Sequence, residues 1–206
     1  MKTLRYCCIF SLLLISIQVF SQREHLDLNE STKAFLEEQA IQRVDKFQEY
    51  CSIIANKDVK TSTKLENIES AMELFVSDKS TIKITNFDGT SQRPKKIEVY
   101  LTKLMNLNYK YVDITSYDFH LSTELTPSIS MRTKYPGEDW YEGTVSVIQR
   151  FTAGRFEYEV VDVVERTFQV YMRKIKFYQG NREVTTFQVK IGDIEGRTIS
   201  TEIIRW

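Results

Sequence analysis

The sequence predicts an α+β domain in which three helices come first and pack on one face of a curved, mainly antiparallel sheet. Before residue 108, apolar residues recur every three or four positions in three segments, which is the period of an amphipathic helix. After residue 108, Val, Ile, Thr, Tyr and Phe dominate four segments, as they do in strands. A run of helices followed by a run of strands is typical of the α+β class.

The first 21 residues have the pattern of a secretory signal peptide. Two basic residues precede an apolar run from Ile9 to Ile17, and small residues stand near Ser21. A membrane anchor is the alternative, but this run is shorter than the roughly 20 residues that a bilayer span needs. We therefore expect cleavage after Ser21, export to the periplasm or the exterior, and no stable membrane span afterwards. We expect 22–30 to be a flexible segment and 31–206 a single domain.

The composition excludes several classes of partner and cofactor. The chain has 28 basic and 28 acidic residues without a long run of either charge, so nothing favours binding to nucleic acid. Cys51 is the one cysteine beyond the signal peptide, and its position on an apolar helix face favours a buried, unreactive thiol. The sequence has no His/Cys cluster, no regular Asp spacing and no Gly-rich phosphate loop, so we expect neither a metal nor a cofactor.

The three helices are expected near 32–56, 63–76 and 94–106. The first carries an apolar face that includes Phe47 and Cys51. The second is expected to begin at a capping box of Thr63 and Glu66, and its apolar stripe is Leu65, Ile68, Met72 and Phe75. Pro94 suits the first turn of the third helix, because proline has no amide hydrogen to lose there.

A short strand is expected between the second and third helices. From Thr81 to Thr85 apolar and polar residues alternate, with Ile82 and Ile84 on the inward side. Asp88 and Gly89 then form a turn signal. The hydrophobic period therefore changes from helical to extended within the stretch 71–85.

Four strands are expected after residue 108: 109–121, 143–151, 156–177 and 183–191. The third is too long for an ordinary strand, so we expect a bend or bulge within it. A turn at 152–155 predicts that Arg150 lies opposite Glu157. For the last hairpin, a three-residue loop at 180–182 predicts that Ile175 faces Phe187, whereas a two-residue loop would pair Lys174 with Phe187. The hydrophobic pattern favours three residues.

The order of elements resembles that of the nuclear transport factor 2-like superfamily, which includes ketosteroid isomerases, scytalone dehydratase and many non-catalytic modules. The stretch Leu74-Phe75-Val76-Ser77-Asp78 and the strand after it resemble the helix-to-strand junction of that superfamily, and 94–105 resembles its third helix. The resemblance covers roughly residues 31–191. It implies a cone-shaped fold whose ligand enters between the concave sheet face and the helices. The catalytic residues of its enzymatic members have no matching positions in this sequence.

Strand 109–121 carries the candidates for acid–base chemistry. Alternation places Tyr111, Asp113 and Tyr117 on one face, which we expect to turn inward, and His120 with Asp118 on the other. An inward Asp113 would need a partner or a shifted pKa, as in a catalytic base, and Tyr117 is its candidate partner. The alternative, which we favour, is that Asp113 points to water. Asp118 and His120 form either an acid–base pair or an ordinary exposed pair.

Residues 122–142 are expected to form a long connection. Long loops are either functional or disordered. Trp140 and Tyr141 lie at its end and are candidates for stacking on a ligand, as Tyr111 is on the neighbouring strand. The favoured alternative is that the two aromatic residues cover an edge of the fold.

The sequence favours an exported, non-catalytic domain that binds a small apolar or aromatic ligand, or a protein partner. One alternative is an enzyme of the isomerase or dehydratase type that uses Asp113 and Tyr117. Another is a structural module that assembles with a second copy through its sheet. The sequence leaves open whether the protein is an enzyme, although the small inventory of catalytic residue types argues against it.

Overall fold

A computed structural model of the chain describes residues 30–86, 88–154 and 156–205. The predicted signal peptide and most of the predicted flexible segment lie outside the described residues. Residues 33–206 form one compact unit. No described helix has the length and apolar character that crossing a membrane requires.

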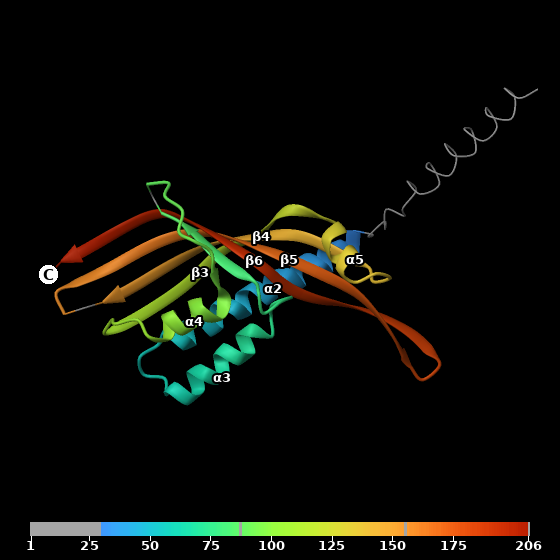
Figure 1. Ribbon diagram of the computed structural model, residues 1–206, viewed down its shortest axis with the longest axis horizontal. Coiled ribbons are helices and arrows are strands. Elements are labelled where there is room, and N and C mark those ends of the chain that lie inside the picture. The colour runs from blue at the N-terminus through green and yellow to red at the C-terminus, as the bar shows by residue number, and fades with distance from the viewer. Residues whose placement is uncertain (1–29, 87, 155, 206) are drawn as a thin grey trace, which may run out of the picture. The chain divides into compact units, whose positions relative to one another are not determined.

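A six-stranded sheet in the order β2-β1-β6-β5-β4-β3 forms one layer of the domain (Figure 1). Its neighbours pair antiparallel except for β1 and β6, which run parallel. The strands are β1 (Thr81–Thr85), β2 (Lys95–Lys96), β3 (Tyr111–Pro127), β4 (Trp140–Gly154), β5 (Tyr158–Gln179) and β6 (Arg182–Arg205). The sheet is curved and open, since its edge strands β2 and β3 do not pair with each other. The predicted α+β class and the mainly antiparallel sheet are confirmed.

Helix α2 (Glu30–Ala55) packs across one face of this sheet. The buried ring of Phe47 makes edge-to-face contacts with Phe75, at 5.2 Å between centroids, and with Phe168 on β5, at 6.0 Å. Ser52 Oγ donates a hydrogen bond of 3.0 Å to the carbonyl oxygen of Ile114 on β3. The first predicted helix and its apolar face, which includes the buried Cys51, are confirmed.

Helix α3 (Thr61–Met72) begins two residues before the predicted start. Its N-cap is Lys60, which makes no side-chain capping bond, so the predicted capping box at Thr63 is wrong. The buried positions are Lys64, Ile68 and Ala71, and Leu65 is exposed. Of the predicted stripe, Ile68 and Phe75 are therefore buried, Met72 is half-buried, and only Leu65 is wrong.

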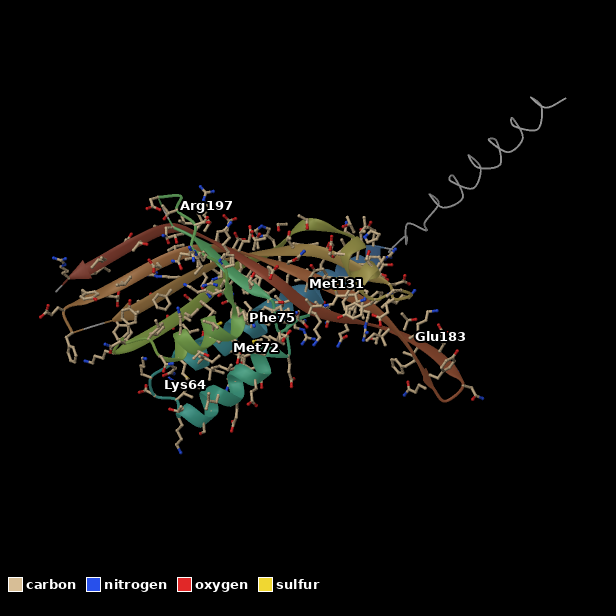
Figure 2. All side chains as sticks on the ribbon, viewed as in Figure 1. Lys64, Met72, Phe75, Met131, Glu183 and Arg197 are labelled. Atoms are coloured by element: carbon tan, nitrogen blue, oxygen red, sulfur yellow. The ribbon has the colours of Figure 1, made fainter. Side chains whose placement is uncertain are left out.

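The change of hydrophobic period marks the place where the chain leaves α3 and joins the sheet (Figure 2). Phe75 lies beyond the helix and forms a parallel bridge with Ile191 of β6, and the Val76 amide donates to the Ile191 carbonyl at 2.8 Å. Five residues further on, β1 pairs with β6 by placing Ile82 opposite Ile194. The predicted strand is confirmed, and its partner is the C-terminal strand.

Helix α4 (Ile97–Met105) starts three residues after Pro94. The prediction that Pro94 occupies the first helical turn is wrong, because Lys95 and Lys96 pair with β1 as strand β2 before the helix begins. Ile97, Leu101 and Leu104 are buried. Leu104 and the half-buried Tyr100 reach the inner face of the sheet, as described below.

Both predicted hairpin registers are wrong, for different reasons. Arg150 lies opposite Val163, and not opposite the predicted Glu157, because β4 continues to Gly154. The register differs from the predicted one by six residues, and because this number is even, every side chain keeps its predicted face of the sheet. In the last hairpin Lys174 pairs with Phe187, which makes the loop two residues long. Gly180 has φ 64 at the first loop position, as the favoured two-residue turns require. This hairpin extends beyond the helices, so no buried face opposes the turn (Figure 2).

The long strand β5 pairs with β4 without interruption over fifteen positions. Its pairing with β6 is irregular in two places, between Val163 and Val164 and between Phe168 and Val170. In both places β6 contributes the extra residue. Gly192 stands at the second one, where an added Cβ would lie 2.6 Å from the ring of Tyr171. The expected bulge therefore belongs to the partner of the long strand.

Residues 122–142 do not form the predicted long loop. Strand β3 continues to Pro127, helix α5 (Ile129–Lys134) follows, and β4 begins at Trp140. Ser128 caps α5 by accepting a hydrogen bond from the Met131 amide. Met131, Trp140 and Tyr171 form a small core there, and strand alternation places Trp140 and Tyr171 on the opposite sheet face from Phe168.

Candidate functional site

A cavity of about 680 Å³ lies between α4, the segment around β1 and the inner face of β4, β5 and β6. Strand β5 supplies three of its side chains, Asp162, Val164 and Arg166, because alternate residues of a strand point to the same face. The apolar part of the wall consists of Ile84, Leu104, Leu107, Phe151 and Val164. The polar and charged residues of the wall are more numerous but contribute less of its surface, and they come from the sheet, from α4 and from the segment 86–95.

Arg166 is the unusual residue of this wall, because it is a cation that is only 5% exposed. Its Nη2 donates a hydrogen bond of 3.1 Å to the Tyr100 hydroxyl, and its guanidinium carbon lies 5.5 Å from the centre of that ring. Its Nε and Nη1 are buried without a hydrogen-bond partner among the described residues. A buried cation is thus held in place by an aromatic residue and keeps unused donors.

The charge of Arg166 acts on two further groups. Burial raises the pKa of Tyr100, while the positive charge of Arg166 opposes this increase. Burial raises the pKa of Cys51 to about 12, and Arg166 again acts in the lowering direction. Both groups are therefore neutral at physiological pH, and neither compensates the guanidinium charge.

A second polar contact lies beside Arg166 on the inner face. Gln149 on β4 lines the cavity, and its Nε2 donates a hydrogen bond to Gln48 Oε1 on α2. Both side chains are buried, and Gln48 Nε2 has no partner within the described part of the chain. Unused hydrogen-bond donors therefore come from both α2 and β5.

The carboxylates of the cavity wall are already engaged. Asp162 accepts a hydrogen bond of 2.6 Å from Thr201 Oγ1, and Asp88 accepts one of 2.7 Å from Thr90 Oγ1. The bonds from Thr90 lower the pKa of Asp88. Lys95 and Lys103 also line the cavity, so its wall carries three cations and two carboxylates.

The predicted candidates Asp113 and Tyr117 lie away from this cavity. Both are exposed, whereas Ile114, between them on β3, is buried and faces α2. The side chains of β3 therefore alternate as predicted, but the set that includes Ile114 faces inward and the set that includes Asp113 and Tyr117 faces outward. The predicted inward face is wrong. Asp113 points to water, in agreement with the favoured alternative.

Asp118 and His120 lie near each other at an exposed edge of the sheet. The distance from His120 Nδ1 to Asp118 Oδ1 is 4.0 Å, and the side chains are 53% and 69% exposed respectively. Asp118 has φ 57, and the pairing of β3 with β4 shifts register between Tyr117 and His120. This irregularity, and not strand alternation, sets the direction of the two side chains.

The three aromatic candidates for ligand binding contact other parts of the protein. The Tyr111 hydroxyl donates to the Glu159 carboxylate, which raises the pKa of Tyr111, and its ring covers Gly154. Trp140 and Tyr141 are 4% and 1% exposed. Trp140 Nε1 donates to Glu138 at 2.8 Å. Trp140 and Tyr141 lie on β4, between β3 and β5 and not at an edge of the sheet, and strand alternation points them to opposite faces. None of the three aromatic residues lines the cavity.

The sequence did not predict four residues of the cavity wall: Tyr100, Gln149, Asp162 and Arg166. A signal for Arg166 exists in the inward set of β5, where one basic residue stands between Val164 and Phe168. The signal is weak because the outward positions of the same strand also include valine, so the sequence alone does not reveal which set faces the helices.

No family model matches the chain, and no curated protein matches it by sequence. Among solved structures, one described as "Putative Scytalone Dehydratase" from Novosphingobium aromaticivorans matches with a TM-score of 0.44 at 12% identity, over 84% of this chain and 90% of that one. The fold assignment therefore stands on the element order and strand pairing described above.

Proposed function

We propose that this protein is an exported, non-catalytic domain that binds a small molecule with an apolar or aromatic body in the cavity between α4 and the sheet. The observation that carries the proposal is a cavity of about 680 Å³ with a mostly apolar wall and a few buried polar side chains. Small-molecule sites are typically concave, of about 300–1,000 Å³, and apolar with a few placed polar groups.

We also propose that the fold is of the nuclear transport factor 2-like type. Three observations support this: three N-terminal helices on one sheet face, a strand between the second and third of them, and a cavity between the helices and the inner face of a curved sheet. The export proposal rests on the apolar run Ile9–Ile17 after a basic start.

An enzymatic function is the second candidate, because an Asp and a Tyr line the same cavity. They are Asp162 and Tyr100, and not the Asp113 and Tyr117 that the sequence predicted. Two observations favour binding over catalysis: Tyr100 contacts Arg166, and Asp162 accepts a bond from Thr201. Turnover of a bound ligand that is lost in Asp162→Asn, with binding retained, would establish the enzyme.

The binding proposal is tested by filling the cavity. The neutral fluorescent probe N-phenyl-1-naphthylamine is titrated into the full chain and into Val164→Trp, whose new side chain occupies the cavity. The control is Glu165→Trp, which places the same side chain on the outer face of the same strand. We expect the unaltered chain and the control to bind the probe and Val164→Trp to lose binding while circular dichroism remains unchanged. Equal binding by both tryptophan variants would refute the proposal.

A further inference from the structure

We propose that the ligand is a carboxylate with an apolar body, whose charged end is held by Arg166 and whose body lies along the apolar wall of the cavity. This inference rests on the proposed function, because it assumes that the cavity binds a small molecule. It adds the chemical class of the ligand and its direction in the cavity.

Arg166 carries a charge that no described carboxylate compensates in an ion pair. A guanidinium stays protonated in proteins, and a buried charge without a partner carries a large desolvation penalty. None of the ion pairs between described residues includes Arg166. Its one hydrogen bond to a described side chain goes to the neutral Tyr100. An anion that enters the cavity supplies the compensating charge that the protein itself does not.

Asp162 is the acidic residue on the same face of β5 as Arg166. Asp162 is four residues from Arg166, which corresponds to roughly 13 Å along an extended strand. It is too far away to form an ion pair, and it already accepts a hydrogen bond from Thr201. A ligand carboxylate is attracted by Arg166 and repelled by Asp162, so its charged end lies toward Arg166 and its body extends toward Asp162.

The rest of the cavity wall fits a ligand that lies in this direction. Val164 stands between the two charged residues on β5, and Leu104 and Phe151 contribute to the same cavity from α4 and β4. The Tyr100 hydroxyl accepts its hydrogen bond from Arg166, so its own hydrogen is available to a ligand oxygen. One buried cation and one hydroxyl suit a monocarboxylate better than a phosphate dianion, which requires more donors.

The experiment compares carboxylates with their neutral amides on the full chain. Octanoate and octanamide form one pair, and 2-naphthoate and 2-naphthamide form a second pair with a rigid aromatic body. Each compound is titrated against bound N-phenyl-1-naphthylamine. We expect each carboxylate to bind about ten- to hundredfold more tightly than its amide, because a hydrogen bond to a charged group is worth that much in affinity.

The variant Arg166→Gln should abolish this preference while retaining the affinity for the amides. The matched control is Arg197→Gln, which removes a cation from the outer face of β6 and should keep the preference. If Arg166→Gln fails to fold, the comparison of each carboxylate with its amide on the unaltered chain still tests whether the cavity prefers an anion. Equal affinity for acid and amide, a preference that survives in Arg166→Gln, or failure of all four compounds to displace the probe would overturn the carboxylate inference. Failure of the probe itself to bind would overturn the proposed function.

Discussion

Replacing Phe47 by alanine should reduce the stability of the whole domain, because its ring joins helix, junction and sheet. It is fully buried on α2 and contacts Phe75 and Phe168 edge-to-face. Truncation of a buried Phe to Ala costs about 3–5 kcal/mol, and the two ring contacts place Phe47 in the upper part of this range, at about 4–5 kcal/mol. For a domain of this size each kcal/mol lowers the melting temperature by about 2–4 °C, so we expect a decrease of about 8–20 °C.

The free energy of unfolding is measured by urea titration followed by circular dichroism. Phe35→Ala is the matched control, since Phe35 lies on the same helix but is 48% exposed, and its loss should change the free energy by less than about 0.5 kcal/mol. Phe47→Leu keeps most of the volume and loses only the ring contacts, so it should cost less than about 1.5 kcal/mol. A loss below about 2 kcal/mol for Phe47→Ala, or similar losses for the two alanine variants, would refute the packing of α2 on the sheet.

Three further predictions concern single positions. Because burial raises the pKa of Cys51 from 9.0 to about 12, the unfolded thiol ionises first, so the free energy of unfolding should fall as the pH rises from about 9 toward 12; a Cys51→Ala variant with the same pH profile would contradict this. Gly180→Ala should cost about 1–2 kcal/mol in chemical denaturation because of the φ of 64 at that position, and an unchanged stability would mean that the turn adopts another form. Mass spectrometry of the protein recovered outside the cytoplasm should find an N-terminus within a few residues of Gln22, whereas an intact Met1 in the membrane fraction would contradict export.

The order and type of the main elements could be predicted because they depend on local periodicity. The helix around Phe47 and the strand Thr81–Thr85 each have enough regular positions for the period to be read directly. Boundaries and registers could not be predicted in the same way. The start of α3 and the length of β4 depend on contacts with distant segments, and the turn at Gly180 depends on local backbone geometry that outweighs the hydrophobic pattern there.

The site could not be predicted from the sequence because it depends on the phase of each strand. In β3 the inward set includes Ile114, whereas the predicted inward set includes Asp113, which is exposed. In β5 both the inward and the outward positions include valine, so the sequence does not distinguish the inward Arg166 from the outward charged residues. The contact of Arg166 with Tyr100 on α4 shows which face of β5 the helices cover. Pairing between strands and helices far apart in the sequence supplies this missing information.

The pairing of β1 with β6 has a consequence for how the chain folds. Thr81 and Asp193 bond across 112 positions, so β1 has only its short neighbour β2, and Phe75 lacks its bridge to Ile191, until β6 has been synthesised. Such distant pairing slows folding, because a long loop must close before its contacts form. During synthesis from the N-terminus, Phe47 on α2 likewise lacks its contact with Phe168 until β5 has been made. In the exported protein that we propose, this late pairing delays completion of the sheet until β6 has been made, which suits passage through a translocation channel.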